Sequence, residues 1–190
     1  MSRRHESTAF LLECLADALI TLMKEKDYRL ITVSEIAKRA GVGRATYFRH
    51  VERKEDLIVF KLKVCWERWA EAAGLRMTNG FALENTEAFF RFNYANREWL
   101  RLVYDAGLSR ILLSTFDVIF AEASLDREQQ YADAFFKYGL CGLLNTWIAN
   151  GFEETPEDMI RIGGNIVRQL VVEETAVKTA GRSRRTAAAG

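Results

Sequence analysis

The sequence predicts an all-α protein of about nine helices, with an N-terminal three-helix head followed by a helical body. Apolar residues recur at spacings of three and four in one stretch after another, as they do on one face of a helix. The 190 residues include a single proline and few turn dipeptides, and no stretch alternates convincingly like a strand or repeats another. With 49% apolar residues, the chain has ample material for a packed core.

The first 26 residues predict a short arm and one amphipathic helix. Residues 1–7 are expected to be loose, and Arg3 and Arg4 either reach a minor groove or belong to a disordered terminus. Residues 8–26 place leucine and alanine at helical spacing, which predicts a helix with one apolar face. We expect this helix to pack behind two shorter ones and complete the head.

The segment over residues 31–51 predicts those two short helices and the turn between them. Thr32 is a good N-cap, and Glu35 three residues later completes a capping box. Gly41 ends the first helix, because glycine takes the left-handed backbone conformation without a steric penalty. The second helix begins at Arg44 and has Tyr47 on its apolar side, with polar side chains outside. This layout is typical of a helix-turn-helix unit.

The remaining elements form the expected body. Residues 54–74 predict a helix that links head and body, and Asn79-Gly80 marks a loop over 75–82. Thr155 and Pro156 predict the start of a last helix. Between the loop and this last helix, further helices are expected over residues 84–96, 97–106, 108–123 and 127–150.

The chain is therefore expected to comprise three parts. These are a DNA-binding domain over residues 1–53, a regulatory and dimerisation domain over residues 54–175, and a disordered basic tail over residues 176–190. The net charge of +1 excludes a general polyanion binder. However, 13 Lys and Arg residues against 9 Asp and Glu residues fall between Met1 and Cys65, so the positive charge gathers in the head. This distribution suits phosphate contact at one end of the chain.

The cysteines and the lengths of the apolar runs indicate the cellular compartment in which the protein is expected. Cys14, Cys65 and Cys141 are odd in number and far apart in apolar helical patterns. Buried thiols in a reducing cytosol are the plain interpretation, and a redox switch or metal site is the alternative. No signal peptide is visible, and no apolar run approaches the ~20 residues needed to span a bilayer. We therefore expect a cytoplasmic protein with no membrane contact.

The sequence contains few residues that could form a catalytic site. Only His5 and His50 are available for a histidine-based triad or metal site, and no Gly-rich phosphate loop, HExxH or CxxC motif occurs. Two acidic pairs, Glu153-Glu154 and Glu173-Glu174, fall at expected helix ends, where solvent exposure is the ordinary outcome. No catalytic residue, metal or cofactor is therefore expected, and the protein is not expected to be an enzyme.

The helix-turn-helix segment closely resembles the DNA-reading segment of the TetR family of one-component bacterial regulators. The resemblance extends over residues 11–60, with a weaker likeness over residues 135–166. One departure is that Tyr47 and Phe48 stand where the family usually has an aliphatic residue or phenylalanine and then tyrosine. The family's tyrosine donates its hydroxyl to a phosphate, so that contact is either lost or supplied by Tyr47 from a shifted angle. The matching residues are Thr32, Ile36, Ala37, Ala40, Gly41, Val42, Thr46, Tyr47, Phe48, Arg49, His50, Lys54, Asp56 and Leu57.

The resemblance implies double-stranded DNA as the partner. Arg44 and Thr46, at the start of the second helix, are placed to contact bases, with Arg49 and His50 nearer the backbone. The alternative is that these are merely solvated polar positions. The full set of expected DNA-contacting residues is Arg3, Arg4, Thr32, Arg44, Ala45, Thr46, Tyr47, Arg49, His50 and Lys54.

The resemblance also implies an inducer cavity in the body and a homodimer. Aromatic side chains either line a pocket for a small apolar ligand or form ordinary core. The candidates are Phe89, Phe92, Trp99, Tyr104, Phe116 and Phe120. The last two helices are more apolar than surface helices, which indicates half of a four-helix bundle. The expected dimer residues are Phe136, Leu140, Leu143, Trp147, Ile160, Gly163, Ile166, Val167 and Leu170.

These observations predict a homodimeric transcriptional repressor that binds a near-palindromic operator. A small molecule or protein partner acting on the body is expected to shift the helix over residues 54–74 and release the DNA. The alternative is a helical adaptor or co-regulator that acts through protein contacts without an inducer.

Overall fold

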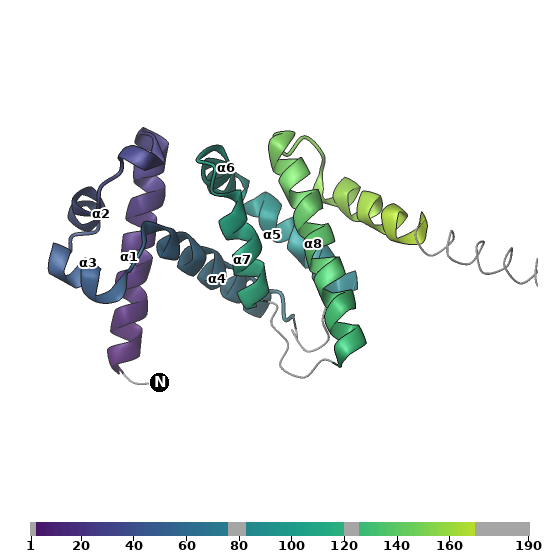
Figure 1. Ribbon diagram of the computed structural model, residues 1–190, viewed down its shortest axis with the longest axis horizontal. Helices are drawn as coiled ribbons and strands as arrows, with labels where there is room; N and C mark the ends of the chain where they lie inside the picture. The colour runs from purple at the N-terminus through teal and green to yellow at the C-terminus, as the bar shows by residue number, and fades with distance from the viewer. Residues whose placement is uncertain (1–2, 76–82, 120–125, 170–190) are drawn as a thin grey trace, which may run out of the picture. The chain divides into compact units, whose positions relative to one another are not determined.

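The computed structural model describes residues 3–75, 83–119 and 126–169. These residues form helices joined by short connections and include no strand, which confirms the predicted all-α class (Figure 1). The chain divides into two compact units, residues 1–153 and residues 154–190. The elements are α1 (Arg3–Glu25), η1 (Tyr28–Leu30), α2 (Val33–Arg39), α3 (Arg44–His50), α4 (Lys54–Ala72), α5 (Leu83–Ala95), α6 (Arg97–Asp105), α7 (Ser109–Ile119), α8 (Arg127–Ala149) and a helix over residues 156–169.

Helix α1 begins earlier than the sequence analysis predicted. It starts at Arg3 rather than Thr8, so the expected loose arm is wrong from Arg3 onward. The physical reason is that arginine and glutamate are good helix formers, and no glycine or proline interrupts residues 3–7. The side chains of Arg3 and Arg4 lie outside the described part of the structure, and their expected minor-groove contact stays a prediction. Residues 76–82 of the expected loop and the expected tail over residues 176–190 also lie outside the described residues.

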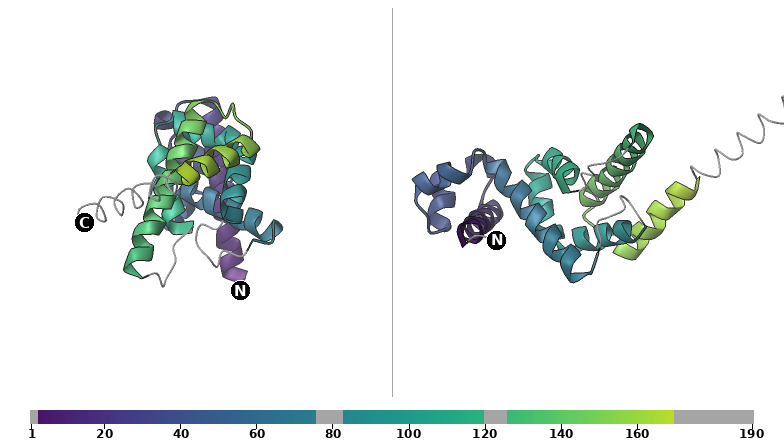
Figure 2. Two further views of the ribbon diagram at one scale, coloured as in Figure 1. Left: turned by 90° about the vertical axis from the view of Figure 1, so that its right-hand side faces the viewer. Right: turned by 90° about the horizontal axis from the view of Figure 1, so that it is seen from below.

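The core of the head joins α1 to α2 and α4. Leu15 and Leu19 on α1, Ile36 on α2, and Leu57 and Ile58 on α4 are all fully buried. Helices α2 and α3 lie together beside α1, and the right-hand view of Figure 2 shows the same group from below. Burial of these apolar side chains stabilises the head, and it fixes the two short helices on the longer ones.

Helix α4 packs against α1 and also contacts α5 and α7. Two ion pairs join it to α1: Lys61 Nζ lies 2.5 Å from Asp17 Oδ1, and Arg68 pairs with Glu13. The partners step backward along α1 as they step forward along α4, and the right-hand view of Figure 2, in which α1 is seen nearly end-on, shows that α4 crosses α1. Helix α4 therefore belongs structurally to both the expected head and the expected body.

An aromatic cluster at the end of α8 contributes to the core of residues 1–153. Trp147 is 1% exposed and stacks on Tyr94, with 5.7 Å between ring centroids. Its ring also meets Phe90 and Phe152 edge-on, at 5.9 Å and 4.9 Å. The chain leaves α8 through Gly151 at φ +75° and Phe152 at φ +59°, which turns the Phe152 ring back onto Trp147. Trp147 was expected at a dimer interface, and this assignment is wrong because its own protomer buries it.

None of the described helices combines the length and apolar character that crossing a bilayer requires. The three cysteines form no disulfide, and Cys141 is buried while Cys14 and Cys65 are half-buried. Burial raises the pKa of the Cys65 thiol, so the thiolate form needed for reactivity is disfavoured there.

Candidate nucleic-acid interface

The two short helices begin and end where the sequence predicted. The Thr32 hydroxyl oxygen accepts a hydrogen bond from the Glu35 backbone N–H at 3.3 Å, and Glu35 Oε2 accepts from the Thr32 N–H at 2.9 Å. This reciprocal pair is the predicted capping box. Gly41 has φ +71°, the left-handed conformation expected where α2 ends. The turn into α3 is thus defined by local chemistry.

Helix α3 has one buried face and one exposed face. Tyr47 and the following Val51 are buried against the head. Thr46 is half-buried, and the helix contains no acidic residue. The exposed residues are Arg44, Ala45, Phe48, Arg49 and His50. The outer face is therefore cationic at its two ends and apolar between them, which suits a surface that meets an anionic duplex.

Thr32 lies at the surface, but its hydroxyl already has a partner. The hydroxyl donates to Glu35 Oε2 at 2.8 Å, and Lys26 Nζ lies 2.5 Å from Glu35 Oε1. These bonds, led by the one from Lys26, lower the pKa of Glu35 to about 2. The Thr32 hydroxyl can donate to a phosphate only if it gives up its hydrogen bond to Glu35. The contact between Thr32 and DNA stays a prediction on that condition.

Lys54 has a structural role that the sequence did not predict. Its Nζ donates to the backbone carbonyls of Tyr28 at 3.1 Å and Ile31 at 2.8 Å, and it lies 4.3 Å from the Tyr28 ring centroid. The Tyr28 hydroxyl in turn donates to Glu55 Oε1 at 2.5 Å. The ammonium thus faces the α1–α2 connection, and its expected phosphate contact is withdrawn. Lys54 and Glu55 instead fasten the start of α4 to η1.

Tyr47 is also withdrawn from the expected DNA contacts. Only 1% of its surface is exposed, and within the described residues its hydroxyl has no hydrogen-bond partner. Burial raises the pKa of this hydroxyl, which keeps it protonated. The hydroxyl therefore does not supply the phosphate contact from a shifted angle.

We expect Tyr47→Phe to leave the head as stable as before, or more stable by about 1 kcal/mol, because it removes a buried hydroxyl that has no partner. Urea denaturation of the two proteins measures this difference. Affinity for a selected DNA duplex is expected to stay within about twofold. A larger loss of affinity with unchanged stability would return Tyr47 to the DNA-contacting set.

Acid is expected to weaken the capping box of α2. Glu35 has its pKa lowered to about 2 from an ordinary value of 4.5, so its contribution to stability is complete above pH 4.5 and lost as the pH falls towards 2. Glu35→Gln is expected to be less stable than the unchanged protein near neutral pH. It is also expected to lose less stability when the pH is lowered. Urea midpoints measured near neutrality and at about pH 3 test this. If both proteins lose the same stability between neutral pH and about pH 3, the acid sensitivity comes from other carboxylates, such as Asp27, whose pKa is also about 2.

Of the four expected ligand-lining aromatics whose side chains the structure describes, three are buried. Phe89 and Phe92 are fully buried, and the Phe92 ring meets Trp66 edge-on at 5.1 Å. Trp99 is buried, with its indole N–H donating to Asn96 Oδ1 at 3.0 Å, and Tyr104 is half-buried. The Phe116 side chain and Phe120 lie outside what the structure describes. Of the two alternatives, a ligand pocket and ordinary core, the structure favours ordinary core for Phe89 and Phe92.

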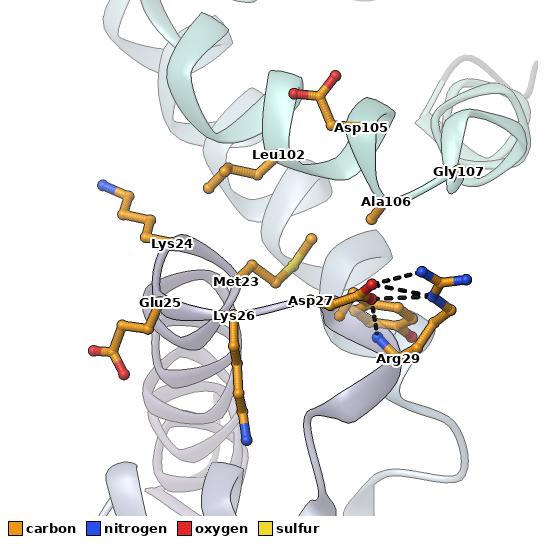
Figure 3. A pocket seen from close by; sticks show the side chains of 11 residues that line it. Met23, Lys24, Glu25, Lys26, Asp27, Arg29, Leu102, Asp105, Ala106 and Gly107 are labelled. Atoms are coloured by element: carbon orange, nitrogen blue, oxygen red, sulfur yellow. Dashed lines mark hydrogen bonds and ion pairs between the residues drawn. The ribbon is translucent and has the colours of Figure 1, made fainter.

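A cleft of about 580 Å³ lies elsewhere, between the end of α1 and the turn after α6. Figure 3 shows Met23 on one side of it and Leu102 and Ala106 on the other. Charged side chains surround this apolar part, and Asp27 holds Arg29 through several hydrogen bonds. None of the six aromatic candidates lines this cleft.

The other expected dimer residues are distributed over two helices. On α8, Phe136 is exposed and Leu140 and Leu143 are half-buried. On the helix over residues 156–169, Ile166 and Val167 are exposed and Ile160 and Gly163 half-buried, and Leu170 lies beyond the described residues. The more exposed aromatics of α8 were not among the expected dimer residues; they are Tyr131, Phe135 and Tyr138.

The fold and the exposed cationic face of α3 define a helix-turn-helix regulator of transcription that binds DNA. Residues 15–59 match the family described as bacterial regulatory proteins, tetR family, and residues 83–169 match a transcriptional regulator C-terminal region. The chain belongs to the TetR family.

A search of curated protein sequences finds no match. Among solved structures, the chain is similar to the fatty acid degradation regulator FadR from Bacillus halodurans, at 17% identity and a TM-score of 0.49. The match covers 80% of this chain and 91% of that one.

Proposed function

We propose that the protein is a homodimeric repressor whose two α3 helices bind the half-sites of a near-palindromic operator. The observation that carries the proposal is the outer face of α3, where Arg44 and Arg49 are exposed and no acidic residue is present. Arginine at the start of such a helix can bond guanine through two hydrogen bonds in the major groove. Two-fold symmetry then places the second α3 about 34 Å away, one turn along the duplex.

A second copy of the chain is the proposed cover for the exposed side of α8. Tyr131, Phe135 and Tyr138 leave large aromatic surface exposed, and Gly139 and Gly142 beside them are exposed too. A Cβ added at either glycine would meet no atom within 4 Å, so space remains for another helix. A two-fold contact between copies would bury these rings and allow close approach at the glycines.

We expect Phe135→Glu to weaken the dimer, because it places a charge where an apolar interface is proposed. Phe10→Glu on α1 is the matched control, since Phe10 is 69% exposed and Phe135 62%. Sedimentation velocity over a concentration series measures the dissociation constant of the dimer. If both variants dimerise like the unchanged protein, the interface lies on another surface.

Release from the operator is proposed to pass through α4. An effector that acts on the body displaces α4, and its ion pairs to Asp17 and Glu13 on α1 move the head with it. The Lys54 and Tyr28 contacts fasten its first turn to the same head. A ligand that prefers the displaced state by a few kcal/mol is enough to shift the population. The effector is a small molecule or a protein partner.

The test begins with binding of the full-length protein to fragments of its source genome. A repressor is expected to recover inverted-repeat sites near promoters, and its affinity should fall steeply as salt rises. Repression is then measured by placing a recovered site before a reporter gene. If no fragment is recovered at low ionic strength while the exposed face of α8 captures another protein, the helical adaptor becomes the better account.

A further inference from the structure

Phe48 is an exposed aromatic residue in the middle of the proposed DNA-reading helix. It is 59% exposed, although it lies beside Tyr47, which is buried. The two rings meet edge-on, with centroids 5.5 Å apart and planes at 79°. The Phe48 ring thus contacts a buried neighbour while more than half of its surface stays exposed.

The neighbours of Phe48 identify the surface to which it belongs. Phe48 follows Ala45 by three positions and Arg44 by four, so the three side chains share one face of α3. Ala45, Arg44 and Arg49 are all exposed. The face therefore has an apolar centre, formed by Ala45 and Phe48, with a guanidinium group on each side.

An apolar centre of this kind selects among the groups that a DNA duplex presents. A phenyl ring carries neither charge nor donor, so a phosphate gains nothing from it. Among the groups that base pairs expose in the major groove, the C5-methyl of thymine is apolar. Arg44 and Arg49 on either side can hold the helix against guanine or phosphate while the ring meets a methyl group.

We propose that Phe48 is a specificity-determining residue that reads thymine through contact between its ring and the C5-methyl group. The inference rests on the proposed function, because it requires α3 to lie in the major groove. The order Tyr47-Phe48 thus places the hydroxyl inside the head and the apolar ring outside. At position 48, where the family usually has a tyrosine that contacts a phosphate, the proposal places an apolar contact with a base. Losing one buried methyl contact corresponds to about a fourfold change in affinity.

The experiment uses a duplex recovered by the full-length protein from a random-sequence library. Each thymine of this duplex is replaced in turn by deoxyuridine, which removes only the methyl group. At one or more positions in each half-site, the unchanged protein is expected to lose about threefold to fivefold in affinity. Phe48→Ala is expected to bind the thymine duplex more weakly and to bind thymine and deoxyuridine equally at those positions, as a double-mutant cycle requires.

Two further variants separate the ring from the charges around it. Phe48→Ala should keep the salt dependence of binding, because the ring neutralises no phosphate, whereas Arg49→Ala should reduce the slope by about 0.9 if Arg49 contacts one phosphate. The exchanged pair Tyr47→Phe with Phe48→Tyr keeps the composition and returns a hydroxyl to the outer face. It is expected to bind DNA and to retain the thymine preference in part, since a phenol ring still meets the methyl group.

The outcomes distinguish the two levels of the proposal. If no deoxyuridine substitution weakens the unchanged protein, or if Phe48→Ala keeps the same thymine preference, the inference is overturned while DNA binding through α3 stands. If the protein recovers no duplex, the proposed function fails and the inference fails with it. Circular dichroism of each variant confirms folding, which a change at an exposed position should preserve.

Discussion

Replacing Trp147 with alanine is expected to lower the free energy of unfolding by about 3–5 kcal/mol, the largest effect among the substitutions considered. The side chain is 1% exposed, stacks on Tyr94 and meets the rings of Phe90 and Phe152 edge-on. Its removal leaves a cavity that these rings fill only in part. Because Phe152 has φ +59°, loss of the contact that holds its ring also leaves an unfavourable backbone conformation without compensation.

Urea denaturation by fluorescence and circular dichroism measures the Trp147→Ala effect. Phe135→Ala on the same helix is the control, because its ring is exposed and its loss should change the stability of a single protomer by less than about 0.5 kcal/mol. Working at low protein concentration separates the protomer's stability from that of the dimer. A small effect of Trp147→Ala on stability, together with dissociation of the dimer, would restore Trp147 to the interface.

Arg44→Ala is expected to weaken binding to the selected operator by about tenfold to a hundredfold and to relax sequence preference at one position in each half-site. The arginine is exposed at the first turn of α3, where a guanidinium can reach base edges. A base contact affects the cognate site more than random DNA. A phosphate contact would weaken both alike and would reduce the salt dependence of binding.

Competitive binding with the operator and a scrambled duplex distinguishes these roles of Arg44. Arg97→Ala is the matched control, since Arg97 is an exposed arginine on α6 whose guanidinium lies 4.4 Å from the Tyr94 ring centroid. The control variant is expected to bind both duplexes like the unchanged protein. Equal binding by Arg44→Ala and the unchanged protein would remove Arg44 from the groove.

Features encoded by neighbouring residues could be predicted from the sequence. The Thr32–Glu35 capping box and the left-handed Gly41 depend on residues within one turn of each other, and both are present. The apolar stripe through Tyr47 was likewise visible from helical spacing, and the residue is buried. These local features were enough to predict the helix-turn-helix unit, and helical spacing of apolar residues along the chain was enough to predict the all-α class.

Features that depend on distant residues were missed. Lys54 binds the carbonyls of Tyr28 and Ile31, which precede it by 26 and 23 positions, so spacing gave no indication of its role. Trp147 lies on an apolar stripe, and periodicity does not distinguish a stripe that packs within the protomer from one that packs between protomers. Phe48 was indicated only by its reversed order with Tyr47, and its exposure became evident from the fold.

The most direct test of α3 as the DNA-reading helix is photo-crosslinking with p-benzoylphenylalanine at position 45. Ala45 is exposed on α3, and Ala72, exposed at the end of α4, provides a control position of the same residue type. We predict cross-links from position 45 to bases within each half-site of the selected operator and none from position 72. Absence of cross-links from position 45 in a protein that still binds the operator would contradict the assignment of α3 to the major groove.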